Sequence, residues 1–335
     1  MGSSSLQSSA GPADFLSAFR SAAGPAGRLR FDRFMDLALF DPAVGYYTRD
    51  RRRVGYGPGT DFFTATTSGE VFADLVIAAC RSLLPGDPRR WTFVEIGAEP
   101  GRGLLEGRTH PFGAARTITL GQPLALAGDC IVFSNELFDA QPCRRFVRAN
   151  GEWHETFVAI QGEALTAIDL PATGVPVALP VEAPEGYRID APIAATDLLR
   201  RIVAEPWRGL FLACDYGKSW VELAEHTPAG TARAYHAHTQ SNDLLARPGE
   251  QDLTCHACWD WLAAGLTDAG FRAPTVVSHE SFFMRQAGAY IEATIAAEAA
   301  GFSPRKLALM QLLHPAHLGQ KFQVLHAIRP PAEIA

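Results

Sequence analysis

The sequence predicts an α/β fold built around a mainly parallel sheet. Apolar runs at 91–97, 130–135 and 209–217 have the length of buried strands, and each ends in glycine or polar residues. Segments with the apolar spacing of helices lie between them. Because ligands of such folds bind outside the carboxyl ends of the strands, we expect Gly97, Asn135 and Asp215 to lie along one edge of a common crevice.

The remaining elements follow from the same patterns in chain order. Residues 1–12, rich in Ser, Gly and Ala, are expected to be a disordered tail or tag remnant. Residues 45–68 are rich in glycine, threonine and aromatic side chains, as is typical of functional loops. Helices are expected within 14–39, with Asp32 opening the second one, and over 70–84 and 194–203; strands are expected at 116–120 and 322–328. We divide the chain into the tail 1–12, an N-terminal helical extension with an active-site loop at 13–90, and the core at 91–330.

Composition excludes several classes of function. The 335 residues carry a net charge of −6, and the longest basic run is Arg51–Arg53, so no nucleic-acid partner is expected. No apolar stretch approaches the roughly 20 residues of a membrane span. The N-terminus also lacks the basic and apolar regions of a secretory signal. We therefore expect a cytoplasmic protein without a membrane partner.

Cysteine and histidine pairs were considered as metal ligands. Cys255 and Cys258 form the single CxxC of the chain, whereas a structural zinc site needs two more ligands at similar spacing. We interpret this segment as the start of a helix capped by Thr254, with both thiols reduced in the core. His236 and His238 would share one face of a strand, where a surface or hydrogen-bonding role is the default. The same default holds for His256, His314 and His317, so no metal site is predicted.

The strand at 91–97 leads into a glycine-containing turn that ends near Gly103. Glycines at a strand-to-helix turn let the backbone approach a ligand, and a helix N-terminus stabilises polar groups. Pro100 restricts the start of that helix to Gly101 or later. A nucleoside cradle and an ordinary strand-helix turn are equally compatible with this spacing.

Longer strings raise the specificity of this interpretation. They include residues 31–47 (FDRFMDLALFDPAVGYY), 59–72 (GTDFFTATTSGEVF), 134–147 (SNELFDAQPCRRFV), and 248–254 (PGEQDLT), with further matches at 94–105, 215–217, 230–235 and 313–328. In these strings, which span most of the chain in the family's order, the sequence resembles the S-adenosylmethionine-dependent methyltransferases of the MidA type.

The resemblance implies a class I methyltransferase core, Rossmann-like with helices on both faces, preceded by an N-terminal helical extension. Its cofactor would be S-adenosylmethionine. The resemblance assigns the following residues to the cofactor site: Glu95, Gly97, Gly101 and Gly103, with Asp61 and Thr64 from a loop that folds over it. Asn135 and Glu136 would lie beside the methyl donor.

Because a mitochondrial member of the family methylates a protein arginine, the resemblance also implies a protein substrate or partner. Paired carboxylates such as Glu136 and Asp139 could hold a guanidinium in bidentate fashion. The alternative is that Asp139 caps a turn and that Glu136 is an N-cap partner of a following helix. We therefore predict catalytic roles for Asn135, Glu136 and Asp139, with this alternative open.

The chain departs from the family between Glu95 and Asn135. The forty positions from one to the other leave room for one crossover, because a βαβ unit takes roughly 30 residues or more. Part of the first half of the core is therefore missing. No acidic residue follows the strand at 116–120, where relatives bind the ribose hydroxyls, although Gln122 could bond one. We expect weak affinity for the cofactor, and two functions stay open: an active methyltransferase, or a degenerate fold acting as a binding or assembly protein.

Overall fold

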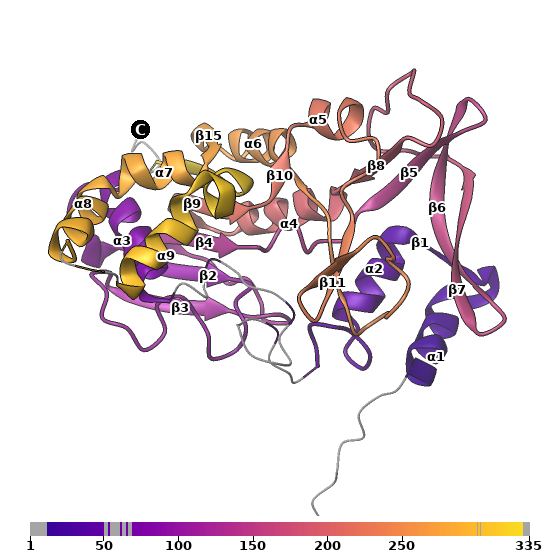
Figure 1. The fold of residues 1–335 in the computed structure, drawn as a ribbon, viewed down its shortest axis with the longest axis horizontal. Helices are drawn as coiled ribbons and strands as arrows, with labels where there is room; N and C mark the ends of the chain where they lie inside the picture. Colours follow the sequence, from indigo (N-terminus) through magenta and orange to yellow (C-terminus); the bar gives the residue numbers. More distant parts are fainter. Residues whose placement is uncertain are drawn as a thin grey trace, which may run out of the picture.

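The computed structural model describes residues 12–49, 53, 61, 65, 69–299, 301 and 303–330. Its main element is a six-stranded sheet in the spatial order β15-β16-β9-β4-β2-β3 (Figure 1). The strands are β2 (Thr92–Ile96), β3 (Ala114–Ile118), β4 (Gly128–Asn135), β9 (Trp207–Asp215), β15 (Arg272–Ser278) and β16 (Gln323–Arg329). The strands β3, β2, β4 and β9 are mutually parallel, and β16 lies antiparallel between β9 and β15. The predicted mainly parallel sheet is confirmed.

The strand register brings three predicted positions to the same edge of this sheet. Glu95 of β2 is opposite Phe133 of β4, and Asn135 of β4 is opposite Cys214 of β9. The carboxyl ends of the three strands therefore lie together, which confirms the expected alignment of Gly97, Asn135 and Asp215. The chain places β3 on one side of β2 and then β4 on the other. This reversal is a topological switch point, the place where open α/β sheets bind ligands.

Helices cover both faces of the sheet, as predicted. One face, with Phe93 and Phe133, packs against α3 (Glu70–Leu83), α7 (His279–Gln286), α8 (Gly288–Ala297) and α9 (Pro304–Leu313). The other face, with Val94 and Val132, packs against α4 (Ile193–Ala204) and α6 (Trp259–Asp268). In α3 the apolar side chains recur at helical spacing and are buried, so the sequence of this helix directs one stripe into the core.

The helix expected after Gly101 is absent. All of residues 97–113 are described, and they form turns and irregular backbone between β2 and β3. Two prolines and five glycines interrupt this segment, and it lacks the apolar repeat that would bury a helix face on the sheet. The expected strand at 116–120 is β3, displaced by two residues. One side of β2 is thus covered by a crossover without a helix.

A second, antiparallel sheet lies at the other end of the long axis of the molecule (Figure 1). It contains β1 (Arg28–Arg30), β5 (Arg144–Ala149), β6 (Glu152–Gln161), β7 (Ala164–Pro171) and β8 (Arg188–Ala191). The N-terminal helices α1 (Pro12–Ala23) and α2 (Phe31–Phe40) bracket β1, a strand that was not predicted. Consequently α2 begins at Phe31, one residue before Asp32. Residues 1–11 of the predicted tail lie outside the described residues.

Two local predictions in the last third of the chain are wrong. The segment 252–258 forms β13 (Asp252–Thr254) and β14 (Ala257–Cys258), and α6 begins only at Trp259. Thr254 therefore caps no helix, although all six thiols are buried and unpaired as expected. His236 ends β11 (Arg233–His236), whereas His238 lies in the turn before β12 (Thr239–Ser241), so the two histidines do not share a strand face. Two further short elements are β10 (Gly217–Lys218) and α5 (Trp220–Glu225).

Candidate active site

Four carboxylates gather at the carboxyl edge of the main sheet, and we call them the acidic cluster. Glu136 and Asp139 follow β4, Asp215 ends β9, and Asp252 begins β13. Asp139, Asp215 and Asp252 are buried, and Glu136 is partly buried. Within the described part of the chain, no Lys or Arg side chain forms an ion pair with any of the four. Among the described residues the cluster is therefore a concentration of acidic groups without a directly bonded basic side chain, and Arg53 acts on Asp252 only through its charge.

Burial is the main reason why every member of the acidic cluster has a raised pKa. Burial, together with the charges of Asp215 and Asp252, raises the pKa of Glu136 to about 8. It raises the pKa of Asp252 to about 6 and that of Asp215 to about 7. Burial and the neighbouring carboxylates raise the pKa of Asp139 as well. Groups that resist ionisation for lack of a counter-charge would gain stability from a bound cation, because an opposite charge favours the ionised form.

Asn135 and Glu136 are adjacent at the end of β4 and contact each other directly. The amide of Asn135 donates to Glu136 Oε1 at 2.9 Å, and the Asn135 Oδ1 atom is buried without a hydrogen-bond partner. No helix follows, since residues 137–142 form turns and a bend in irregular backbone. The alternative in which Glu136 is an N-cap partner is therefore wrong. The pair forms a polar end to the strand at the topological switch point.

Aromatic hydroxyls surround the acidic cluster. Tyr47 donates to Asp252 Oδ1 at 2.9 Å, and Tyr235 on β11 lies directly opposite Asp252 on β13. Tyr216 follows Asp215 and stacks on His256, with ring centroids 6.3 Å apart. Burial, followed by the charges of Glu136 and Asp139, raises the pKa of Tyr216. Tyrosines thus border the cluster, and the Tyr47 hydroxyl donates directly to one of its carboxylates.

Asp61 connects the N-terminal loop to the β11–β12 hairpin. Its buried carboxylate accepts hydrogen bonds from the Tyr46 hydroxyl at 2.6 Å and from the Ala237 amide at 2.9 Å. The His238 amide donates to the backbone carbonyl of Asp61. These contacts place Asp61 beside the acidic cluster, where its charge raises the pKa of Asp252. Thr64, predicted with it as a cofactor residue, lies outside the described residues.

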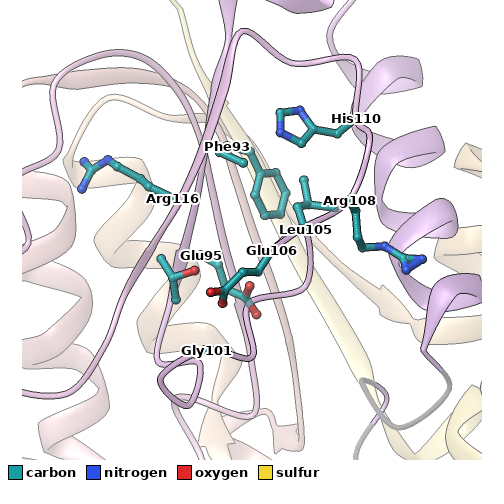
Figure 2. Close-up of a pocket in the computed structure, with 11 residues that line it drawn as sticks. Phe93, Glu95, Gly101, Leu105, Glu106, Arg108, His110 and Arg116 are labelled. Carbon is teal, nitrogen blue, oxygen red and sulfur yellow. The ribbon is translucent and has the colours of Figure 1, made fainter.

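The glycine turn is closed by Glu95. This buried β2 side chain accepts a hydrogen bond from the Leu104 amide at 2.5 Å, and burial raises its pKa to about 7. A Cβ at Gly103 would overlap the Thr117 hydroxyl of β3, so only glycine fits there. Figure 2 shows Glu95 and Gly101 at the lower end of a cavity of about 400 Å³, which lies over β2 and β3 where the crossover has no helix.

The residues at the switch point fit the predicted cofactor in two respects. Gly97 has φ of +90°, and a Cβ there would lie 2.7 Å from Leu137 Cδ1, so the tight turn after β2 and its close approach to Leu137 both require glycine. The buried, unpartnered Asn135 Oδ1 offers an acceptor on the facing strand. Glu99, a negative charge in the turn, is compensated by Arg53 at 3.3 Å and by Arg102 at 3.5 Å.

The ribose side of the predicted site is less complete. β3 ends at Ile118, and the Gln122 side-chain oxygen accepts a hydrogen bond from the Thr119 amide at 2.9 Å. That oxygen is therefore used to close a turn. No carboxylate follows β3, as the sequence indicated.

Several residues of the site were not identified from the sequence. Asp252 and Tyr47 are 205 positions apart and meet only because β13 and the N-terminal segment pack together. Arg53 reaches Glu99 from the 45–68 loop. The signal for Asp252 in the sequence is the PGEQDLT string at 248–254, which belongs to the resemblance although the resemblance assigns no role to this carboxylate.

The fold and this strand-end site define a class I methyltransferase-like protein. A crystal structure from Burkholderia thailandensis bound to S-adenosyl-homocysteine aligns with a TM-score of 0.80, at 24% identity over 95% of this chain and 92% of that one. A second native structure from the same organism aligns with a TM-score of 0.77 at 23% identity, covering 95% and 91%. At this identity the likeness establishes the fold.

The sequence comparisons point to methyltransferases as well. The model of the family described as "Putative S-adenosyl-L-methionine-dependent methyltransferase" matches residues 118–277. Curated relatives are the mitochondrial protein arginine methyltransferase NDUFAF7 of Mus musculus and that of Rattus norvegicus, each 22% identical over 88% of this chain and 80% of the relative. Over residues 118–277 the chain is therefore similar to this family of S-adenosylmethionine-dependent methyltransferases. None of the helices in the described ranges is long and apolar enough to cross a membrane.

Proposed function

We propose that the chain transfers a methyl group from S-adenosylmethionine to a cationic nitrogen, most simply the guanidinium of a protein arginine. The observation that supports this acceptor class is the acidic cluster, which concentrates carboxylates without a basic partner among the described residues. Carboxylate pairs bind a guanidinium through charge-assisted, bidentate hydrogen bonds. The curated relatives, named as protein arginine methyltransferases, point to the same acceptor.

Glu136 and Asp139 are the residues proposed to hold the acceptor. Glu136 is the most accessible member of the cluster, whereas Asp139 is 5% exposed and lies deeper. Their positions beside Asn135 would hold the nitrogen at the end of β4, next to the turn at Gly97. Most of the rate of such a transfer comes from this placement.

Bound S-adenosylmethionine supplies an electrophilic methyl group on a sulfonium. The nitrogen that receives it must lose a proton, and a carboxylate within hydrogen-bond reach can accept that proton. Burial raises the pKa of Glu136 to about 8, which makes its carboxylate a stronger base than an exposed glutamate near neutral pH. Glu136 is therefore proposed as both the acceptor ligand and the proton acceptor.

Glu95, Gly97, Gly101 and Gly103 are proposed to form the cofactor side. Glu95 fixes the turn through the Leu104 amide, and Gly101 leaves open space beside its backbone. Asp61 would act through the hairpin that it holds. A protein substrate and a cytoplasmic location remain proposals, and the curated relatives are mitochondrial.

The test is methyl transfer from radiolabelled S-adenosylmethionine to three peptides that differ at one position, which is Arg, Lys or Gln. We expect label in the Arg peptide, none in the Gln peptide, and at least about tenfold less in the Lys peptide, the scale of one lost charge-assisted hydrogen bond. Transfer to all three at equal rates would contradict the acceptor assignment.

The degenerate-fold alternative is favoured by one observation, the helix-less crossover beside β2. It predicts no transfer to any peptide and no binding of S-adenosylhomocysteine even at millimolar concentration.

A further inference from the structure

Glu136 has an unusual backbone conformation for its residue type. Its φ is +52°, in the left-handed region that side chains other than glycine, asparagine and aspartate rarely adopt. The residue follows β4 directly, and its amide donates to the Cys214 carbonyl of β9 at 3.0 Å. A strained residue persists only where the surrounding structure holds it, and such residues concentrate at functional sites.

The group that holds this conformation is the Asp215 carboxylate. Asp215 Oδ2 accepts hydrogen bonds from the Leu137 amide at 3.1 Å and from the Phe138 amide at 2.8 Å. Asp215 Oδ1 accepts from the Tyr216 amide at 2.8 Å. Successive amides that converge on one anion after a left-handed residue form a concave anion-binding arrangement, and here the anion belongs to the protein itself.

Asp215 therefore fixes both proposed acceptor ligands. Glu136 precedes the two amide donors, Leu137 and Phe138, and Asp139 follows them, so the turn sets the direction of both side chains. Glu136 and Asp139 lie close enough for the charge of Glu136 to raise the pKa of Asp139. Without the amide contacts to Asp215, repulsion between these two carboxylates would favour opening of the turn. Asp215 is fully buried and cannot touch the acceptor.

We propose that Asp215 is a positioning residue: its carboxylate holds the 136–139 turn so that Glu136 and Asp139 face the methyl acceptor. This inference rests on the proposed function and adds to it the group that sets the geometry of the acceptor site. The Asp215→Asn variant retains one oxygen acceptor and loses the charge and half of the acceptor capacity.

The kinetic test compares Asp215→Asn with Asp190→Asn. Asp190 is also buried and also accepts two backbone amides, from Thr231 and Ala232, but it lies on β8 of the second sheet. We expect kcat for the Arg peptide to fall about tenfold to a hundredfold in Asp215→Asn, the scale of a small misplacement of the reacting groups. The acid limb of its pH profile should move about one unit lower, because removing a neighbouring charge lowers the pKa of Glu136.

Asp190→Asn should keep kcat within about twofold and leave the pH profile in place, because Asp190 bonds to Arg145, Thr231 and Ala232 and to no residue of the 136–139 turn. If both variants lose kcat in proportion to their loss of thermal stability, with unchanged pH profiles, Asp215 has only a structural role and the inference is overturned.

The second test measures the turn without any acceptor. The Glu136→Gly variant should unfold about 2 °C higher than Glu136→Ala, because only glycine adopts the positive φ without strain. In the Asp215→Asn background the turn relaxes and this difference should vanish. A difference that persists there, or that is absent in the unmodified background, contradicts the proposal. If Asp215→Asn does not fold, hydrogen exchange of the unmodified protein is measured instead. The Leu137 and Phe138 amides should then be protected from exchange at least about a hundredfold. Exchange as fast as in an exposed loop would overturn the inference.

Failure of the proposed function gives a different result. If the unmodified chain methylates no peptide, the proposed function and the positioning role both fail. The geometry of the turn is then still decided by the comparison of Glu136→Gly with Glu136→Ala.

Discussion

Replacing Glu136 by Gln should stabilise the protein at alkaline pH while it slows methyl transfer. The amide keeps the volume of the side chain and removes its charge. Burial raises the folded-state pKa of Glu136 to about 8, whereas an unfolded glutamate titrates near its reference value of 4.5. The folded protein therefore binds this proton more tightly than the unfolded chain, and the unmodified protein loses stability as pH rises between these two values. The glutamine side chain of the Glu136→Gln variant has no such titration.

The magnitude follows from the difference between the two pKa values. A difference of about 3.5 units corresponds to roughly 5 kcal/mol at 1.36 kcal/mol per unit. Glu136 is partly exposed, and solvent screening reduces this upper bound to about 2 kcal/mol. We expect the free energy of unfolding of the two proteins to agree at pH 4.5 and to differ by about 2 kcal/mol above pH 8, with Glu136→Gln the more stable.

Urea unfolding between pH 4.5 and 9 measures this difference, with Glu152→Gln, an exposed carboxylate on β6, as the control that should show no pH-dependent gain. Turnover of Glu136→Gln on the Arg peptide should fall about a hundredfold or more, the scale of one positioned electrostatic group. An unchanged stability difference across this pH range would refute the placement of Glu136 in the acidic cluster. Unchanged turnover would refute its role in catalysis.

Three further predictions concern the rest of the site. In steady-state kinetics, Asp139→Asn should raise the Michaelis constant for the Arg peptide about tenfold, the scale of one charge-assisted hydrogen bond. Calorimetry should show unchanged binding of S-adenosylhomocysteine. An unaltered Michaelis constant would mean that Asp139 is not part of the acceptor site. Gly97→Ala should weaken the binding of S-adenosylhomocysteine at least about tenfold, because the added Cβ would contact Leu137 and the backbone φ is +90°. The control for backbone strain alone is Gly151→Ala, a position with φ of +76° and open space around it. The unmodified chain should bind S-adenosylhomocysteine weakly, because no carboxylate follows β3, which costs about ten- to a hundredfold in affinity; a submicromolar dissociation constant would show that other groups compensate.

The sequence predicts the sheet and its functional edge because both depend on local patterns. Apolar runs of strand length end at Gly97, Asn135 and Asp215, and parallel strands must bring such ends together. The same local reasoning fails where an element is determined by pairing between strands that lie far apart in the sequence. Thr254 and Cys255 look like a helix start, but pairing of β13 with β11 and of β14 with β10 delays the helix to Trp259.

Only part of the acidic cluster can be predicted from local sequence. Glu136 and Asp139 were identified through the NELFDAQP string, whereas Asp252 and Tyr47 join them only through tertiary packing. The left-handed backbone at Glu136 has no local signal, since a glutamate does not favour it, and it depends on a carboxylate 79 positions later in the chain. The absent crossover helix was harder to foresee, because glycines at a strand end are compatible with a helix start.

If the acidic cluster binds a cation, binding should release protons, and this release can be measured. Isothermal titration calorimetry with N-acetyl-arginine amide, at pH 7 with saturating S-adenosylhomocysteine and in two buffers of different ionisation enthalpy, measures the protons released. Carboxyl groups with raised pKa values, such as Glu136 at about 8, are partly protonated until a guanidinium displaces the proton. We predict release of about half a proton to one proton per site, at least tenfold weaker binding of the neutral citrulline analogue, and less proton release in Glu136→Gln. Equal binding of the arginine and citrulline compounds without proton release would show that the acidic cluster is not a cation-binding site.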